Sequence, residues 1–262
     1  MQASLVVSKT GLAAQDAKMT AIANNLANVS TTAYKKDRVA FQDLFYQVQT
    51  QPGAQMDQDN QSPSGIQLGT GVRVVGTQKI FTVGDISTTS NQLDVAINGQ
   101  GFFKITLANG DTAYTRDGEF QTNSDGQLVT SSGLPLDPQI TIPDNTTAVT
   151  IGTDGTVTAT VSGQTDAQTL GQISLVNFIN PAGLQATGNN LYLATTASGD
   201  PVEGNPGDDA FGSLKQYALE SSNVSVVDEM VDMMATQRAY EMNAKVVSAS
   251  NEMLQYATQN MG

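Results

Sequence analysis

Apolar residues recur at strict intervals of seven near both ends of this 262-residue chain. At the N-terminal end these residues are Leu5, Leu12, Met19 and Leu26, with Ile22 at a neighbouring seam position. At the C-terminal end they are Val226, Met233, Tyr240, Val247 and Leu254. Such a repeat is typical of helices that pack along a narrow seam, as in coiled coils. It therefore predicts two terminal helices, with these residues as their contacts with each other or with further copies of the chain.

The C-terminal helix has clear boundary signals. Ser225 is the expected N-cap, with Asp228 three residues later as its capping partner. Residues 226–259 contain neither Gly nor Pro, so the helix can run for about 50 Å at 1.5 Å per residue. Periodicity alone fits the core of an ordinary helical bundle as well as it fits an intermolecular seam.

The middle of the chain has a different period. Residues 72–74, 103–107 and 173–175 alternate as half-buried strands do. Four turn dipeptides separate such segments: Asn109-Gly110, Asp117-Gly118, Asp125-Gly126 and Asp154-Gly155. We therefore expect an α+β fold in which an antiparallel barrel or sandwich-like β domain is inserted between the two terminal helices.

These segments predict four regions along the chain. Residues 1–30 form an N-terminal helix and residues 219–262 a C-terminal helix, which together make a coiled-coil layer. Residues 31–71 form an extended connector that includes a polar insertion at 47–64. Residues 72–218 form an outer β-rich domain.

The composition removes most enzyme chemistry. The chain has no Cys and no His, so thiol nucleophiles, disulfides, thiolate metal sites and the commonest general base are all missing. Gly69-Thr70-Gly71 and Gly99-Gln100-Gly101 each lack the third glycine and the following helix of a phosphate-binding loop. The segment from Asp57 fails the calcium-loop pattern at its sixth and twelfth positions. We therefore expect no catalytic residue, no metal and no cofactor.

The charge distribution excludes further classes. The formal net charge is −13, and residues 46–219 carry 16 acidic against 5 basic groups. Because no basic face is available to displace phosphate counterions, nucleic-acid binding is not expected. No run of about 18 apolar residues is present, so we expect no membrane span. The N-terminus also lacks the pattern of a cleaved signal peptide.

The segments at the two ends resemble the signatures of the flagellar basal-body rod and hook axial family. Residues 23–36 carry the first of them, and its matching positions are Asn24, Asn25, Leu26, Ala27, Asn28, Thr31, Thr32, Tyr34 and Lys35. Residues 219–241 carry the second, with Gln237, Arg238, Ala239 and Tyr240 near its end. The usual pattern has Asn and Gly where this chain has Ser30 and Ala33, and an Ala at position 33 disfavours a positive φ there.

The resemblance extends through the middle of the chain, where 68–75, 94–103, 114–118 and the polar insertion resemble the distal-rod members of the family. It implies a structural subunit that leaves the cell by type III export and assembles as a rigid helical rod across the periplasm to the outer membrane, transmitting torque from motor to hook. The implied partners are further copies of the chain, proximal rod proteins, hook protein, the L and P rings, the rod cap and the export apparatus.

Two alternatives stay open from the sequence. The first is another axial protein, such as a proximal rod or short hook subunit. The second is a secreted carbohydrate-binding or hydrolytic β protein, in which carboxylates of the Asp-Gly pairs would do the chemistry. The second alternative leaves both terminal signatures unexplained.

Overall fold

The computed structural model shows an α+β chain with a helix at each end and antiparallel strands between them. The described residues are 2–51, 55–57, 60–61, 64–163 and 167–260. They fall into two compact units. Unit 1 consists of Met1–Ala27, Asp37–Gln78 and Ser225–Gly262, and unit 2 of Asn28–Lys36 and Lys79–Val224.

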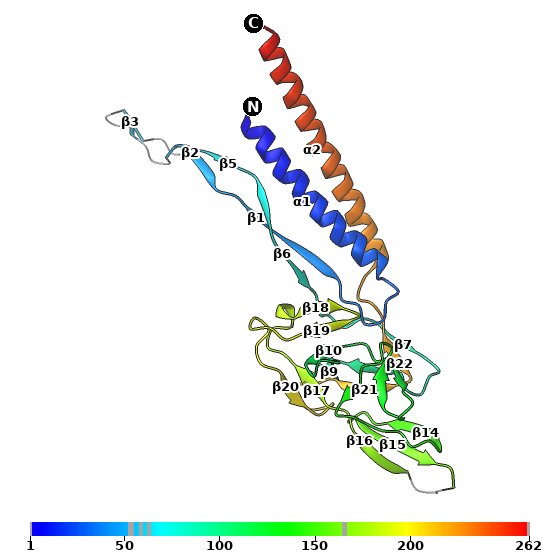
Figure 1. Ribbon diagram of the computed structural model, residues 1–262. Helices are drawn as coiled ribbons and strands as arrows, with labels where there is room; N and C mark the ends of the chain where they lie inside the picture. Colours follow the sequence, from blue (N-terminus) through cyan, green and yellow to red (C-terminus); the bar gives the residue numbers. More distant parts are fainter. Residues whose placement is uncertain (1, 52–54, 58–59, 62–63, 164–166, 261–262) are drawn as a thin grey trace. The chain divides into compact units, whose positions relative to one another are not determined.

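Both predicted terminal helices are confirmed. In unit 1, α1 (Gln2–Ala27) and α2 (Val226–Asn260) lie side by side and run in opposite directions (Figure 1). Ser225 caps α2, because its hydroxyl oxygen accepts the N–H of Asp228 at 3.5 Å and its carbonyl accepts the N–H of Glu229 at 3.0 Å. Within the part of the chain described, neither helix has the length and apolar character needed to cross a membrane.

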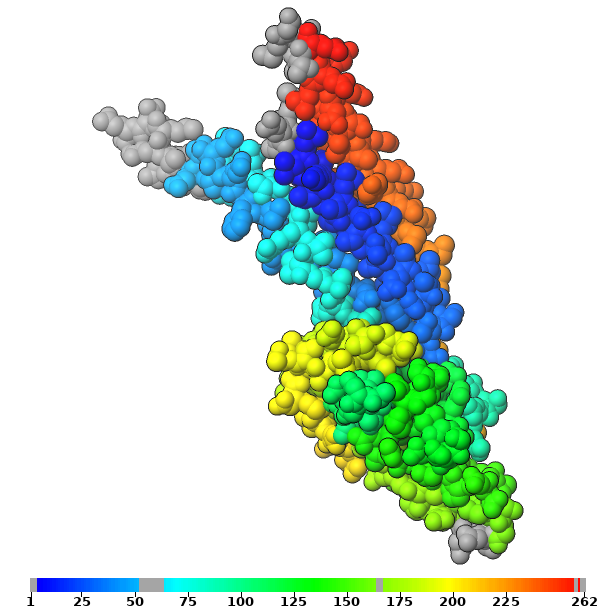
Figure 2. Space-filling view, in the orientation of Figure 1, coloured from blue at the N-terminus to red at the C-terminus, as the bar shows by residue number. Residues whose placement is uncertain are grey.

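The rest of unit 1 is a ribbon of paired strands that runs beside α1 (Figure 2). The pairs are β1 (Asp37–Asp43) with β6 (Val72–Lys79), β2 (Tyr46–Thr50) with β5 (Ile66–Gly69), and β3 (Gln55–Asp57) with β4 (Asn60–Gln61). The backbone N–H of Val72 donates to Thr10 Oγ1 at 3.3 Å, which joins the ribbon to α1. Of the polar insertion, residues 52–54, 58–59 and 62–63 lie outside the described residues.

Unit 2 is built around a seven-stranded antiparallel sheet in the order β18-β19-β10-β9-β17-β20, with β13 also paired to β9. Its strands are β9 (Phe102–Thr106), β10 (Thr112–Thr115), β13 (Leu136–Asp137), β17 (Leu175–Asn177), β18 (Gln185–Gly188), β19 (Leu191–Leu193) and β20 (Val202–Gly204). The path of the sheet is open, ending at β18 and β20, and no sheet of the described strands closes into the expected barrel.

Smaller sheets complete unit 2. A three-stranded sheet contains β14 (Thr146–Ile151), β15 (Thr156–Val161) and β16 (Gln168–Gln172). The pairs are β7 (Ile86–Thr88) with β22 (Ala218–Glu220), β8 (Val95–Asn98) with β21 (Ser213–Gln216), and β11 (Phe120–Thr122) with β12 (Leu128–Thr130). A short 3-10 helix, η1, spans Pro181–Gly183.

The core of unit 2 covers both faces of the large sheet. Phe103 and Ile105 of β9 belong to one buried cluster, and Phe102 belongs to a second cluster with Tyr114 and Val176. Because successive side chains of a strand point to opposite faces, neighbouring phenylalanines enter different clusters. The Phe103 ring meets the Phe120 ring edge-on at 5.1 Å between centroids, which joins the large sheet to β11.

Two local expectations for the middle of the chain are wrong. Turns form at Asn109-Gly110, Asp125-Gly126 and Asp154-Gly155, but no turn is assigned to residues 116–118, which lie between β10 and β11. A Cβ on Gly118 would lie 1.7 Å from the carbonyl oxygen of Val95, so this glycine allows a close backbone approach instead of a turn. Residues 173 and 174 also fall between β16 and β17.

Candidate functional site

The buried Asn25 joins three segments of unit 1: the end of α1, the start of α2 and the start of β1. Asn25 Nδ2 donates to Glu229 Oε2 at 3.3 Å and to the carbonyl oxygen of Asp37 at 3.0 Å, and Asn25 Oδ1 accepts the Asp37 N–H at 2.8 Å. Asn24 donates to the Asp37 carboxylate at 3.3 Å. A buried asparagine in a helix seam fixes the register of the pair. Asn25 therefore aligns α1 with α2 and with the start of β1.

The predicted seam residues lie along the helix pair with different degrees of burial. Ile22 is buried. Half-buried positions are Leu5, Leu12, Met19, Leu26, Met233, Val247 and Leu254. Val226 and Tyr240 are 40% and 39% exposed, respectively. The apolar heptads thus flank the intrachain contact without filling it, and their role in contacts between copies stays a prediction.

The contact between the helices contains polar and small residues that the sequence analysis missed. Ser8, Thr236 and Ser250 are buried, and Lys18 pairs with Asp232 at 3.7 Å. A Cβ on Gly11 would lie 3.2 Å from Asn243 Nδ2, so the helices approach closely there. Apart from Ser8 and Asp232, these positions carried a signal of their own, because 11, 18 and 25 on α1 and 229, 236, 243 and 250 on α2 also recur at intervals of seven.

In unit 2, the second half of the N-terminal signature is held by hydrogen bonds from distant segments. Asn190 Nδ2 donates to the Thr32 carbonyl at 3.1 Å, and the Lys36 N–H donates to Asn223 Oδ1 at 2.8 Å. The Thr31 hydroxyl lies 3.2 Å from Asn28 Oδ1. Tyr34 is buried, with the Lys79 ammonium 4.9 Å from its ring centroid. The signature is therefore a docking segment of unit 2 as well as the end of a helix.

Ala33 adopts the backbone conformation that its sequence was expected to disfavour. Its φ is 55°, and its side chain is 2% exposed. Its N–H donates to the carbonyl oxygen of Glu220 at 2.7 Å. This hydrogen bond and the surrounding packing hold the residue in a left-handed conformation that costs an L-residue about 1 kcal/mol. The tertiary contact outweighs the local preference.

Substitutions at Ala33 should separate the cost of its positive φ from the gain of its tertiary packing. Ala33→Gly should change the free energy of unfolding by less than about 1 kcal/mol, because relief of backbone strain offsets the loss of one buried methyl group. Ala33→Val should destabilise unit 2 by about 3 kcal/mol, since a β-branched residue is both strained at positive φ and too large. Urea unfolding of the two variants tests this expectation, and equal stability of the two would contradict it.

The most buried charges of unit 2 form one network. Glu220 accepts hydrogen bonds from Lys35 Nζ at 2.5 Å and from Arg116 Nε at 2.7 Å. The Gly84 N–H also donates to this carboxylate, at 2.8 Å. Arg116 donates further to the carbonyl oxygens of Gly101 and Gly99, both at 2.9 Å, and Lys35 donates to that of Thr82 at 2.7 Å. One carboxylate thus holds two cations that are almost fully removed from solvent.

The surroundings of Lys35 lower its pKa from the ordinary value of a lysine. Burial lowers the pKa of the Lys35 ammonium, and the nearby Arg116 acts in the same direction, whereas Glu220 opposes both. Within the described residues, every buried side-chain nitrogen and oxygen has a hydrogen-bond partner. The network is therefore fully satisfied, as a buried polar cluster must be to persist.

Sequence reasoning singled out Lys35 but missed Arg116 and Glu220. Both lay inside segments that had been noted, Arg116 in the 114–118 motif and Glu220 in the C-terminal signature. No local periodicity pairs residues 35, 116 and 220, so their proximity is a product of the fold. The other C-terminal signature residues do not enter this cluster: Gln237 and Arg238 are exposed on α2, and Ala239 is half-buried.

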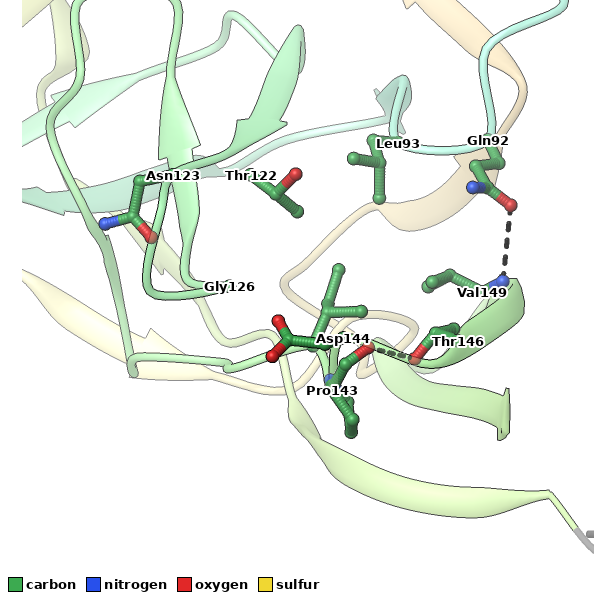
Figure 3. Close-up of a pocket in the computed structure, with 10 residues that line it drawn as sticks. Gln92, Leu93, Thr122, Asn123, Gly126, Pro143, Asp144, Thr146 and Val149 are labelled. Carbon is green, nitrogen blue, oxygen red and sulfur yellow. Dashed lines mark hydrogen bonds between the residues drawn. The ribbon is translucent and has the colours of Figure 1, made fainter. Parts of the chain in front are cut away.

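A shallow pocket of about 280 Å³ is present elsewhere in unit 2 (Figure 3). Its walls include Leu93, Asn123 and Asp144. The Thr146 hydroxyl is bound to the Pro143 carbonyl at 2.7 Å, and Gln92 accepts the Val149 N–H at 3.3 Å. Among the residues that line it, Asp144 is the single ionisable one, so the pocket has no acid–base pair or charged clamp for chemistry.

Asp117, next to the network, should give unit 2 a distinct pH dependence. Burial raises the pKa of this carboxyl, against hydrogen bonds from the Glu119 N–H and from Asn190 that lower it. A raised folded pKa means that the carboxyl contributes stability at low pH that is lost as pH rises through that pKa. Compared with Asp117→Asn, the native chain should gain stability as pH falls from 7 towards 4. Urea unfolding at several pH values tests this, and a constant difference would contradict it.

Three family models match the chain, and together they reach both ends. The model described as "Flagella basal body rod protein" matches residues 5–35. The "Flagellar hook protein FlgE/F/G D1 domain" model matches residues 96–159, and the "Flagellar basal body rod FlgEFG protein C-terminal" model matches residues 215–260. The matched regions contain Lys35, Arg116 and Glu220, respectively.

Full-length relatives are also similar. The chain is 51% identical over 256 residues to the flagellar basal-body rod protein FlgG of Buchnera aphidicola subsp. Schizaphis graminum, with 98% of each chain covered. It is 45% identical over 260 residues to FlgG of Caulobacter vibrioides, with 99% of each covered. Similarity to FlgF of that same organism is lower, at 37% over 246 residues, covering 92% of this chain and 90% of the relative.

Proposed function

The chain belongs to the flagellar basal-body rod protein family, and on this premise we propose that it builds the distal rod by packing its helices against further copies of itself. It is a structural subunit of the rod and not an enzyme. Our reading of its parts is that residues 1–30 and 219–262 form the inner assembly domain. Residues 31–71 would be the connector and residues 72–218 the outer β-rich domain.

The observation that carries the assembly proposal is the outward face of α2. Eight apolar side chains of α2 are between 46% and 71% exposed: Val227, Met230, Val231, Met234, Met242, Val246, Met253 and Tyr256. At 3.6 residues per turn, Val227, Val231 and Met234 lie opposite the face that contains Glu229 and Thr236, whereas Val246 and Met253 follow Asn243 and Ser250 by three residues and lie beside that face. Exposed apolar side chains along the length of a helix mark an interaction surface.

A further copy of the chain is the occupant that we propose for this face. Head-to-tail contacts that do not close into a ring produce a helical filament, which is the architecture of a rod. Unit 1 has further exposed apolar side chains, among them Tyr46 of β2, Ile66 of β5 and Phe45 just before β2. Burying each such side chain between copies would contribute roughly 1.5 kcal/mol or more.

Charge substitutions on the outward face test this proposal. The double variant Val231→Asp with Met234→Asp should leave the helices and unit 2 folded but should prevent rod formation, because two carboxylates would be buried between copies. Asn251→Asp adds a charge to an exposed position of the same helix, on the side away from Met253 and Tyr256, and serves as the control. The readouts are swimming and the yield of purified basal bodies. Normal rods built from the double variant would overturn the proposal.

The polar insertion is the feature that we expect to distinguish a distal rod protein from a proximal rod or short hook protein. We propose that residues 47–64 keep the rod straight and rigid, a role that family resemblance implies. Deleting them should produce rods of altered straightness or length while subunits still assemble. Unchanged rods from the deletion would favour a proximal-rod position. Proximal rod proteins, hook protein, the L and P rings, the rod cap and the export apparatus are the partners that we propose.

A further inference from the structure

The charged network of unit 2 joins three segments that are far apart in the chain. Lys35 lies in the segment that follows α1, Arg116 lies between β10 and β11, and Glu220 is the last residue of β22, shortly before α2 begins at Val226. The network is therefore complete only when both segments that lead to the helices are docked on the β unit.

Glu220 is required electrostatically. Side chains of Lys35 and Glu220 are 0% exposed, and that of Arg116 is 3% exposed. Among the described residues, Glu220 is the carboxylate that both cations contact. If β22 were absent or undocked, two buried cations would lack their counter-ion, and removing one partner of a buried pair is strongly destabilising.

The docking of β22 also depends on backbone contacts around Glu220. The Ser221 N–H donates to the Asp85 carbonyl at 2.8 Å, and the Ala33 N–H donates to the Glu220 carbonyl at 2.7 Å. A Cβ on Gly84 would lie 2.1 Å from the Ser221 carbonyl oxygen, so the segment before β7 and the segment after β22 approach each other without spare room. The same residue thus supplies the anion and one of the backbone links to the N-terminal segment.

We propose that Glu220 closes the β unit, so that the unit completes its fold only when the segments flanking both helices are docked. A chain whose C-terminal segment has not arrived, or is held elsewhere, keeps the β unit open. This part stands on the contacts of unit 2. Its consequence, that an incomplete subunit does not present a finished β unit to the growing rod, rests on the proposed function.

The test compares two backgrounds in the full-length chain as a free subunit. The first is the native network, and the second replaces it with apolar residues through Lys35→Met, Arg116→Leu and Glu220→Leu. Apolar replacement of a complete buried charge cluster can preserve or raise stability, whereas loss of one member does not. Glu220→Gln in the native background should lower the folding equilibrium constant of the β unit by about 100-fold or more.

A second variant undocks β22 without altering a charge. It distinguishes an effect of β22 on the whole β unit from a local effect on the strands next to it. Ser221→Pro removes the N–H that bonds to Asp85. Hydrogen exchange is measured in β9 and β10, which are not paired with β22. In the native background, Ser221→Pro should speed exchange throughout these strands by about tenfold or more. In the apolar background, the increase should stay near residues 84–88 and 218–222.

Equal local effects of Ser221→Pro in both backgrounds would overturn the inference, as would unchanged stability of Glu220→Gln. If the apolar background does not fold, the proposal is still tested by comparing Glu220→Gln with Ser221→Pro in the native chain. Closure requires both variants to open β9 and β10 together, and a purely local effect of either contradicts it. Because the subunit is free in solution, these results do not depend on whether the chain forms rods.

Discussion

Replacing Val247 with Asp is expected to abolish assembly while the β unit stays folded. Val247 is half-buried on α2, three residues before the buried Ser250, so a carboxylate there enters the helix contact. Loss of the valine's burial costs about 1.5 kcal/mol, and partial burial of an unpaired charge adds to that cost. Because several layers of the helix contact are polar, few apolar contacts remain to offset this loss of stability.

The measurement is the yield of rods in cells that carry the variant, together with near-ultraviolet circular dichroism of the purified subunit. The dichroism reports on Tyr114 and Tyr192, which are buried in unit 2. Val247→Leu keeps an apolar side chain of similar size and should assemble. If Val247→Asp built rods of full length, the assignment of this heptad to assembly would be wrong.

The second large effect is expected from one added methyl group at Gly118. A Cβ at this position would lie 1.7 Å from the Val95 carbonyl oxygen and 3.4 Å from the Phe103 ring. Because the Val95 N–H also bonds to the Gly118 carbonyl at 3.0 Å, the two backbones cannot separate without losing that bond. Gly118→Ala should therefore destabilise unit 2 by about 3 kcal/mol.

Gly76, in β6 of unit 1, provides a control for the effect of an added methyl group where there is room for it. No atom lies within 4 Å of a Cβ built on it, and its φ is not in the left-handed region. Gly76→Ala should change stability by no more than a few tenths of a kcal/mol, or raise it slightly by restricting the unfolded chain. Urea unfolding of both variants decides the matter. Equal stability of the two variants would show that the backbone contact at Gly118 is not a constraint.

The helices could be predicted because their information is local. Two heptad repeats and the absence of Gly and Pro between 226 and 259 were enough to place α2, and Ser225 marked its start. The same reasoning placed the apolar heptads at the centre of the helix contact, although they flank it. Gly11, Asn25 and Asn243 recur at the same interval, yet a polar heptad beside an apolar one is easily taken for a solvent-exposed face.

The β unit was less predictable because its defining contacts are not local. Asp117-Gly118 has the composition of a turn, but Gly118 is needed for the approach of Val95, which is far away in the sequence. Ala33 is held at positive φ by Glu220. Neither the network around Glu220 nor the open path of the large sheet leaves a periodic signal, since both arise from which strands come together.

The absence of cysteine from the chain allows a direct test of the central claim, that the outward face of α2 is covered by further copies in the rod. A single cysteine is introduced at Met234, which is 51% exposed, and its reaction with a maleimide is compared in the free subunit and in isolated basal bodies. The account predicts rapid labelling of the free subunit and at least about tenfold slower labelling in the rod, because the face becomes buried. Equal rates in both would contradict it and would mean that the rod is held together by other surfaces.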